Sequence, residues 1–507
     1  MPKDKLFHNF SRNANAILIL ALLALYLSMA SGDLTGNAYG ADGGDLLTAM
    51  LVSGVPHPTG YPTYTLLGKL FQLIPVGTPY LRASLLSMVA AVLAVGLMAS
   101  WYQLLGAEEG EDKNRGMLIG ALSGLVVGVA PLFWGHAVIV EVYALQALFI
   151  VLALYWSSLL LKYQVLQPGD ALLYGLAFAF GAGFGNHITL VLIVPIVALA
   201  VWRASKQGLA RRIFVGQFFF GLLGLCVYIY LPLAASRHPA VNWGNPQTWD
   251  GFVWEVSGQA YGQLAFGIPP AMIQQRLFAW ASLLKEQFGV AGLLLGVVGA
   301  VQFPPKNRFM QGALIWVFAV YSIFAIGYNT ADSVAYLIPA LIALVVWIGR
   351  GIEGLWQLGT QKIPWGKFAV VVGMLLILAR VPGNYSVVDP RNDVRPARFA
   401  EHYLETIPSD AILAPESDQD IFPLWYYHFG LGIRPDVRIV VPALTQFTWY
   451  RQNLMHTYPD LDYPAIDVEP SAAWQAALVQ LNTSRPVCLS WADESSTYGI
   501  EFQCQAE

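Results

Sequence analysis

The chain has 507 residues, of which 56% are hydrophobic and 12% are charged, and its mean hydropathy is +0.52. A chain with so few charged side chains cannot cover one large soluble core, so most of it is expected to lie in lipid. The net charge of −4, without a basic cluster, argues against a nucleic-acid-binding protein.

Apolar runs long enough, or nearly long enough, to span a bilayer predict about eleven transmembrane helices in a mostly α-helical protein. The pair at 171–202 is interrupted by Gly183, Gly185, Asn186 and His187, so it could instead be one long tilted helix or a re-entrant pair. The predicted spans are residues 14–31, 83–104, 116–134, 137–161, 171–185, 188–202, 213–234, 288–303, 311–328, 333–349 and 367–384.

The distribution of Lys and Arg predicts the orientation. With the N-terminus inside, fifteen of these residues fall in inner segments and six in the outer segments before residue 385. Because positive residues collect on the cytoplasmic side, the N-terminus is expected to be cytoplasmic and the protein to lie in an inner or plasma membrane. Two long loops, 32–82 and 235–287, and the C-terminal segment would then be extracytoplasmic.

The C-terminal segment differs in charge from the rest of the chain. Residues 1–384 carry 21 Lys/Arg and 15 Asp/Glu, whereas residues 385–507 carry 7 and 17. We therefore expect a transmembrane domain over 1–384, followed by a separate soluble extracytoplasmic domain over 385–507.

The first outer loop contains two carboxylates three residues apart, Asp42 and Asp45. In a helix they would share a face, so both could point at one substrate. A carboxylate at the boundary of lipid and water can act as a general base, or help to bind a divalent cation through oxygen. The alternative is an Asp that caps a short helix starting near Leu46.

A rigid turn follows these carboxylates. Prolines and a glycine restrict the backbone of the sequence HPTGYP, in which His57 and Tyr61 offer hydrogen-bond donors suited to a phosphate. Arg82 lies beyond the turn on the same outer side. It could neutralise an anionic lipid head group, or extend to the membrane interface as arginines commonly do.

Polar residues also interrupt the apolar spans. Glu141 lies near the outer end of the run HAVIVEVYAL, where a carboxylate is costly and therefore has a partner or a function. Candidate partners are His136, Tyr143 and the Asn186–His187 pair, and a structural network between helices is the alternative. Asn186 and His187 could also face a cavity at the outer ends of the helices.

The second outer loop is dense in Trp, Tyr, Pro and Gly. Its aromatic rings suit the interfacial belt of a membrane protein, or a sugar stacked on their faces. Near its start, Arg237 and Trp243, with His238 and Asn242, could complete an anion-binding mouth.

The C-terminal segment predicts a small α/β domain, because strands and helices alternate. Cys488 and Cys504 fall in two short strand-like runs, and could form a disulfide on the outer side or remain two separately buried thiols. A Gly-rich phosphate loop and a Cys-x-x-Cys metal motif are absent from the sequence. The predicted elements are helices at 395–406, 419–429 and 471–481, strands at 411–417 and 437–441, and the two Cys-bearing strands.

Several blocks in order resemble domain-of-unknown-function family 2723, which is similar to membrane glycosyltransferases of the C type and includes protein O-mannosyltransferase-like members. The blocks are DGGD with GVPHPTGYPTYTLLGKL (residues 42–70), FWGHAVIVEVYALQALF (133–149), GFGNHITLVLIVP (183–195), YIYLPLAASRHPAVNWGNPQTWDGF (228–252) and WYYHFGLGIRPDVRIV (425–440). In the family pattern Asp-Ser-Gly-Glu, Asp42 matches the first acid and Asp45 the last, while Gly43 and Asp45 depart from it.

The resemblance implies an inverting transfer of a sugar, mannose or another hexose, from a polyprenyl-phosphate donor to an extracytoplasmic acceptor. Asp42 would be the base, and Asp45 a supporting acid. The acceptor would be a protein (Ser or Thr included), a lipid or a glycan, and membrane lipids would surround the enzyme. Relatives with and without a metal exist, so no cofactor follows. The alternatives are a transporter or flippase of lipid-linked sugars, and a non-catalytic membrane scaffold.

Overall fold

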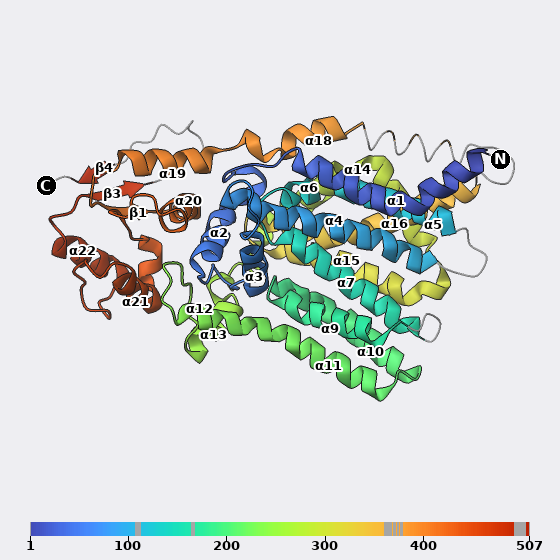
Figure 1. Ribbon diagram of the computed structural model, residues 1–507, viewed down its shortest axis with the longest axis horizontal. Helices are drawn as coiled ribbons and strands as arrows, with labels where there is room; N and C mark the ends of the chain where they lie inside the picture. The colour runs from blue at the N-terminus through green and yellow to red at the C-terminus, as the bar shows by residue number, and fades with distance from the viewer. Residues whose placement is uncertain are drawn as a thin grey trace.

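The computed structural model describes residues 2–106, 113–163, 168–358, 379–490 and 503–505, together with residues 368, 372 and 375. Long helices run side by side along most of the molecule, and a small sheet with short helices lies at the end that holds the C-terminus (Figure 1). The N-terminus lies at the opposite end (Figure 1).

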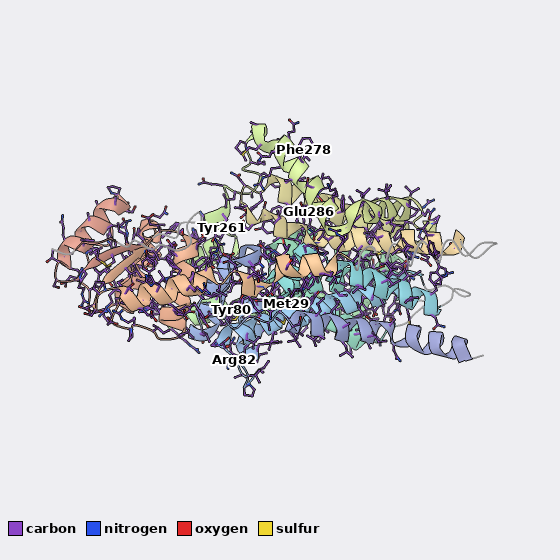
Figure 2. The ribbon with its side chains drawn as sticks, turned by 90° about the horizontal axis from the view of Figure 1, so that it is seen from above. Met29, Tyr80, Arg82, Tyr261, Phe278 and Glu286 are labelled. Carbon is purple, nitrogen blue, oxygen red and sulfur yellow. A yellow bond between two sulfur atoms is a disulfide. The ribbon has the colours of Figure 1, made fainter. Side chains whose placement is uncertain are left out.

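Seven helical stretches in the described part of the chain are long and apolar enough to cross a membrane. Their helices are α4 (Pro79–Gly106), α7 (Tyr143–Leu161), η2 (Ile188–Ile193) with α10 (Val194–Lys206), α11 (Arg211–Leu225) with η3 (Cys226–Ile229) and α12 (Tyr230–Ala235), α14 (Ile273–Val301), η6 (Pro305–Asn307) with α15 (Arg308–Gly327), and η7 (Asp332–Leu337) with α16 (Ile338–Leu358). The first half of α14 projects from the bundle, with Phe278 near its tip (Figure 2).

Three further apolar stretches correspond to predicted spans. Helices α5 (Lys113–Gly128) and α6 (Pro131–Ala137) form a pair bent by 76°, which corrects the prediction of one continuous span at 116–134. The break precedes Pro131, which lacks the N–H that would continue the helix. The other two are the shorter apolar helices in α1 (Pro2–Leu27) and α9 (Asp170–Phe184). The predicted span 367–384 falls mainly outside the described residues.

The ambiguous pair at 171–202 consists of two helices rather than one long helix. Helix α9 ends at Phe184, and η2 begins at Ile188. Between them, His187 adopts an extended backbone, and its Nδ1 accepts a hydrogen bond from the backbone N–H of Thr189. The polar residues of GFGNH therefore form the connection between two apolar helices.

The loops 32–82 and 235–287, for which we keep the names first and second outer loop, pack against each other. The first contains η1 (Asn37–Asp42), α2 (Gly43–Val52) and α3 (Pro62–Phe71), and the second contains α13 (Trp249–Val256), η4 (Gln259–Tyr261) and η5 (Pro270–Met272). Val55 of the first loop bonds through its N–H to the carbonyl of Val241, and its own carbonyl accepts from the N–H of Trp243. This short bridge fixes the HPTGYP turn beside the second loop.

The C-terminal region forms a four-stranded sheet in the order β2-β1-β3-β4, with β1 parallel to β2 and β3 and with β4 antiparallel to β3. Helices at 395–406 and 471–481 lie where the sequence predicts them, whereas α21 was not predicted. The elements are α18 (Val381–Val388), η8 (Pro390–Asn392), α19 (Arg395–Thr406), β1 (Ile412–Pro415), α20 (Asp418–Trp425), η9 (Tyr426–Gly430, a π-helical turn), β2 (Arg438–Ile439), η10 (Pro442–Gln446), α21 (Thr448–Thr457), α22 (Ser471–Leu481), β3 (Val487–Ser490) and β4 (Gln503–Gln505).

Cys488 and Cys504 form a disulfide. They are paired partners in the antiparallel ladder of β3 and β4, so the bond joins the two strands directly. Of the two alternatives open from the sequence, the disulfide is the one present.

The C-terminal region is seated on the first outer loop through α20. A Cβ atom on Gly44 would lie 2.5 Å from the carbonyl oxygen of Phe422, so α2 and α20 approach closely at this glycine. Two further contacts hold the regions together: the hydroxyl of Tyr427 donates to Asp33 (2.6 Å), and the N–H of Gly36 donates to the carbonyl of Asp393 (3.0 Å).

We expect Gly44→Ala to lower the free energy of unfolding by about 1–3 kcal/mol, because the added methyl group meets a backbone oxygen that cannot move independently. Thermal unfolding of the purified chain in detergent measures the effect. Gly383→Ala is the matched control, since a Cβ there has no atom within 4 Å. Equal melting temperatures for the two variants would contradict the close packing of α2 on α20.

Candidate active site

A cavity of about 580 Å³ lies where the two outer loops, the α15–α16 connection and the C-terminal region meet. It is lined by carboxylates, by His57 and by tyrosines from segments far apart in the sequence. The lining residues are Gly36, Ala41, Asp42, His57, Tyr61, Tyr143, Tyr261, Leu264, Tyr328, Thr330, Ala331, Asp332, Tyr336, Arg395, Pro396, Asp418, Gln419 and Pro423.

His57 lies between the two carboxylates of the first outer loop. Its backbone N–H (2.8 Å) and its ring Nδ1 (2.7 Å) both bond to Oδ2 of Asp45. On the other side of the ring, Nε2 lies 3.7 Å from Oδ2 of Asp42. The three side chains therefore form a row in which Asp42 faces the cavity and Asp45 lies behind the imidazole.

Asp42 and Asp45 have different environments. The Asp42 side chain is 37% exposed and lines the cavity, and although it occupies the cap position of α2 it makes no capping hydrogen bond. Asp45 is fully buried, and its Oδ1 accepts a hydrogen bond from the indole of Trp243 (3.2 Å). Asp42 therefore does not cap α2 through its side chain. Asp42 lines the cavity, whereas Asp45 does not.

The local backbone holds His57 in place. The N–H of Gly60 bonds to the carbonyl of His57 (2.9 Å), which closes the turn, and Gly60 has a positive φ of +80° that favours glycine. The Tyr61 ring lies 5.0 Å from the His57 ring. The turn is tied to the transmembrane helices because the N–H of Thr63 donates to the carbonyl of Gly185 (2.8 Å).

Burial and nearby charges shift the pKa values of Asp42 and His57, whose side chains face each other. Burial raises the pKa of Asp42 to about 6; His57 opposes this rise, while Asp418, Asp332 and Asp45 add to it. Burial lowers the pKa of His57, but Asp42, and the hydrogen bond and charge of Asp45, outweigh it and bring it to about 9. Near neutral pH, His57 is an imidazolium beside an ionised Asp42 that can accept a proton.

The polar residues predicted within apolar spans lie in connections near the cavity: Glu141 precedes α7, which begins at Tyr143 rather than at the predicted 137, and Asn186 and His187 lie between α9 and η2. Tyr143 lines it, and the His187 ring lies 5.6 Å from the Tyr143 ring and 6.1 Å from the Tyr61 ring. The Asn186 amide donates to the carbonyl of Val142 (3.1 Å). Oε2 of Glu141 accepts from the N–H of Val142 (3.2 Å), so its carboxylate bonds to the backbone just before α7 begins.

Arg82 and Arg237 are not among the described residues that line the cavity. Arg82 lies at the edge of the molecule (Figure 2), where its guanidinium donates to the carbonyl of Ile74 (3.4 Å). Arg237 is exposed. The cations expected at the mouth therefore do not line the cavity that holds His57.

Three groups of lining residues were not predicted: Asp332, Asp418, and the tyrosines 261, 328 and 336. Asp332 opens the helix that leads into α16, and its position just before an apolar run is the one sequence signal that it carries. Asp418 comes from the C-terminal region. Among the residues that the structure describes, no group of three or more His, Cys, Asp or Glu side chains could hold a metal ion.

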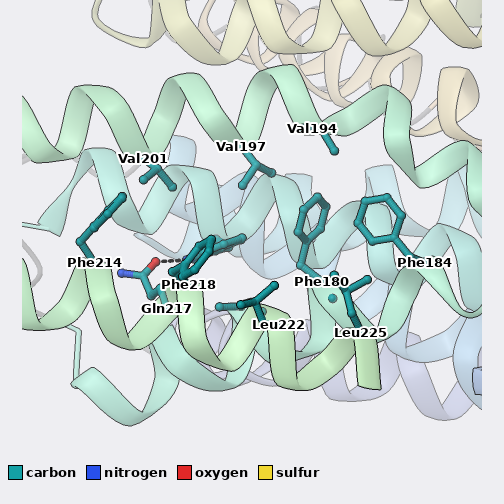
Figure 3. A pocket seen from close by; sticks show the side chains of 14 residues that line it. Phe180, Phe184, Val194, Val197, Val201, Phe214, Gln217, Phe218, Leu222 and Leu225 are labelled. Carbon is teal, nitrogen blue, oxygen red and sulfur yellow. Dashed lines mark hydrogen bonds between the residues drawn. The ribbon is translucent and has the colours of Figure 1, made fainter. Parts of the chain in front are cut away.

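A second, almost entirely apolar cavity of about 290 Å³ lies between α9, α10 and α11 (Figure 3). Its one side-chain amide, Gln217, accepts a hydrogen bond from the indole of Trp156 (3.0 Å). At the other end lies Phe184, next to Gly185, which bonds to Thr63 beside the active-site turn. The lining residues are Trp156, Ala177, Phe180, Gly181, Phe184, Val194, Val197, Val201, Phe214, Gln217, Phe218, Gly221, Leu222 and Leu225.

Two segments of the chain match family models. Residues 42–209 match the protein O-mannosyl-transferase TMEM260 N-terminal domain, and residues 396–470 match the TMEM260-associated domain 2. Both segments contribute to the cavity: the first begins at Asp42, and the second includes Asp418.

Two relatives match most of the chain. The protein O-mannosyl-transferase TMEM260 of Mus musculus is 26% identical over 455 residues, which is 84% of this chain and 62% of the relative. The protein O-mannosyl-transferase tmem260 of Dictyostelium discoideum is 21% identical over 518 residues, which is 91% of this chain and 61% of the relative. The chain thus spans less than two thirds of the length of either relative.

Solved structures show the same fold. ArnT from Cupriavidus metallidurans bound to undecaprenyl phosphate matches with a TM-score of 0.59 at 15% identity, over 94% of this chain and 92% of that one. ArnT in the apo state matches with a TM-score of 0.51 at 14% identity, over 89% and 96%. The predicted fold class, a polytopic helical glycosyltransferase C-like protein with a small C-terminal sheet, is confirmed. The chain therefore carries two segments similar to TMEM260 family domains, on the fold of ArnT.

Proposed function

We propose that the protein is an integral membrane enzyme that transfers mannose or another hexose from a polyprenyl-phosphate donor to an extracytoplasmic acceptor, Ser or Thr of a protein included. The observation that carries this proposal is the cavity in which Asp42 faces the imidazole of His57. The N-terminus would be cytoplasmic, with residues 1–384 as the membrane domain and 385–507 as an extracytoplasmic domain.

The comparisons support the chemistry. The mouse and Dictyostelium relatives are named protein O-mannosyl-transferases, and the solved ArnT contains undecaprenyl phosphate. These names indicate a protein acceptor for the relatives and a polyprenyl-phosphate ligand for ArnT. Assignment to domain-of-unknown-function family 2723 is consistent with the matches and is part of the proposal.

The geometry suits a single displacement with inversion. A carboxylate oxygen of Asp42 removes the proton of the acceptor hydroxyl, and the hydroxyl oxygen forms a bond to C1 of the sugar. The bond from C1 to the phosphate oxygen breaks, and its electron pair leaves with the polyprenyl phosphate. His57, an imidazolium with Nε2 on the Asp42 side, donates a hydrogen bond to the departing phosphate.

Asp45 and Trp243 act through His57. The carboxylate of Asp45 accepts two hydrogen bonds from His57 and one from Trp243, so it fixes the orientation of the ring and stabilises its positive charge. We propose that Asp45 is a positioning residue and that Asp42 is the base.

The rate of transfer is expected to rise with pH through about 6 and to fall through about 9. Below the lower value Asp42 is protonated and cannot accept a proton; above the upper value His57 loses the charge that stabilises the phosphate. The measurement is kcat/KM for the lipid donor from about pH 5 to about pH 10. A rate that stays flat through pH 6 would contradict Asp42 as the base.

The apolar cavity of Figure 3 suits the isoprenoid chain of the donor. It lies among membrane-spanning helices, and Phe184 lines one end of it. The next residue, Gly185, accepts a hydrogen bond from the N–H of Thr63, which directly follows the HPTGYP turn. An isoprenoid tail held in this cavity would place the phosphate of the donor at the outer end of the helices, near Tyr61.

We expect Leu222→Trp to raise KM for a long-chain polyprenyl donor by about tenfold, because the larger side chain fills the cavity. A donor with a two-isoprene chain should be affected little. Leu223→Trp is the matched control: Leu223 is 43% exposed against 48% for Leu222, but only Leu222 lines the cavity. Equal effects of both variants on KM for the long-chain donor would rule out this cavity as the binding site of the isoprenoid tail.

Transfer itself is tested with membranes that contain the full chain, labelled polyprenyl-phosphate mannose and a mixture of secreted proteins. The proposal predicts label that alkaline β-elimination releases from Ser or Thr. Label in a lipid or glycan fraction would correct the acceptor. Movement of the labelled lipid across the membrane without transfer would contradict the enzyme and favour the flippase alternative.

A further inference from the structure

Two carboxylates in the cavity take no part in the mechanism above. Asp332 comes from the connection between α15 and α16, and Asp418 comes from the first turn of α20 in the C-terminal region. The negative charges of Asp332 and Asp418 both raise the pKa of Asp42, so the three carboxylates interact across the cavity. Together they bring acidic groups from three distant parts of the chain into one cavity.

Neither carboxylate caps its helix through a side-chain hydrogen bond. The N-terminus of α20 is capped by Ser417 and Asp420, each of which bonds to the backbone of the other. The cap position of η7 is Ala331, and Asp332 follows it in the first turn. Both carboxylates thus lie in a first helical turn, which favours acidic residues, and both also line the cavity.

The surroundings of the carboxylates suit a neutral polyhydroxyl group. Tyr261, Tyr328 and Tyr336 line the cavity, and aromatic faces pack well against the C–H groups of a sugar ring. The lining therefore combines aromatic faces for a sugar ring with carboxylates that accept hydrogen bonds from its hydroxyl groups.

The negative charges of Asp332 and Asp418 determine which part of the donor can bind beside them. A phosphate beside Asp332 and Asp418 would meet like charges, whereas sugar hydroxyls donate hydrogen bonds to carboxylates. The cation Arg395 also lines the cavity, but its guanidinium is bound to Asp393 (2.6 Å). The positive charge of His57 therefore suits the phosphate, and the carboxylates of Asp332 and Asp418 suit the hydroxyl groups of the sugar.

We propose that Asp332 and Asp418 bind the hydroxyl groups of the transferred sugar and hold its C1 toward Asp42. This inference rests on the proposed transfer from a lipid phosphate and extends it, because it makes the C-terminal region a part of the sugar site. The two residues determine donor specificity, while Asp42 and His57 carry the chemistry.

The test compares the affinities of the full chain, in lipid nanodiscs, for polyprenyl-phosphate mannose and for polyprenyl phosphate. The dissociation constant for polyprenyl phosphate divided by that for polyprenyl-phosphate mannose isolates the contribution of the sugar. We expect Asp332→Asn and Asp418→Asn each to reduce that ratio by about tenfold or more, with the affinity for polyprenyl phosphate unchanged. Asp250→Asn, an exposed residue of α13, is the matched control and should leave the ratio as in the wild type.

The outcomes separate the inference from the function on which it rests. A ratio that stays at the wild-type value in both variants would overturn the inference while leaving sugar transfer intact. A loss of affinity for polyprenyl phosphate with an unchanged ratio would also overturn it. A wild-type chain that binds neither lipid would contradict the proposed function itself. Thermal unfolding of each variant confirms that the isosteric change leaves the fold in place.

Discussion

Asp42→Asn is expected to lower kcat for sugar transfer by about 100- to 10,000-fold, with the affinity for the lipid donor little changed. The amide has nearly the shape of the carboxylate but cannot accept the proton of the acceptor hydroxyl. Because Asp42 faces the cavity and makes no hydrogen bond that caps α2, the substitution should leave the local fold intact.

The measurement is single-turnover transfer of labelled mannose by wild type and variant, beside equilibrium binding of the donor to both. Asp250→Asn, which is exposed and distant from the cavity lining, serves as the matched control. A variant with wild-type kcat would remove Asp42 from the chemistry. A variant that fails to bind the donor would instead assign Asp42 to binding.

Asp45→Asn is expected to reduce kcat by about 100-fold, the scale of loss that misplacement of a reacting group produces. The neutral amide cannot stabilise the His57 imidazolium, and its single oxygen is a weaker acceptor for the two N–H groups that now bond to Oδ2 of Asp45. The ring would lose both its orientation and much of its charge.

The pH profile distinguishes this positioning role from a general loss of structure. Asp45 raises the pKa of His57 through a hydrogen bond and through its charge, so its removal should move the alkaline limb of the profile from about 9 to a lower pH. Trp243→Phe, which removes one hydrogen bond to Asp45 but retains the charge, should shift the limb much less. An alkaline limb that stays in place in Asp45→Asn would show that Asp45 does not act through His57.

The core of the site could be predicted from the sequence because its parts are local. Asp42, Asp45 and His57 lie within sixteen residues, and the turn around Gly60 holds them together with short-range contacts. Spacing alone does not distinguish the two carboxylates, whereas the family resemblance implies Asp42 as the base and Asp45 as a supporting acid. Spacing of three suggests one helical face, but Asp42 ends the 3-10 helix η1 while Asp45 lies inside α2, so the two side chains diverge around His57.

The remainder of the site depends on tertiary packing. Asp332 and Asp418 are separated from Asp42 by hundreds of residues in the chain, and no local pattern indicates that they meet. The seating of α20 on α2 at Gly44 brings Asp418 to the cavity, while Asp332 reaches it from the connection between α15 and α16. The roles expected for Arg82 and Arg237 rested on their side of the membrane alone, which does not determine the direction in which a side chain points.

The membrane helices illustrate the same limit. Apolar length identified most of the described spans, because burial in lipid is a property of the segment itself. The 76° bend between α5 and α6 and the separation of α9 from α10 depend on Pro131 and on the polar connection at 185–187. Both breaks lie at residues whose backbone chemistry interrupts an apolar segment, and apolar length alone does not reveal them.

The proposed sugar donor is a lipid phosphate bound in the membrane. The purified full chain, in nanodiscs, is supplied with labelled mannose on polyprenyl phosphate or on a soluble nucleotide, and the label is followed into an acceptor protein. We expect transfer from the lipid donor only, with an equal amount of polyprenyl phosphate released. Transfer from the nucleotide sugar, or release of free mannose without transfer, would contradict it.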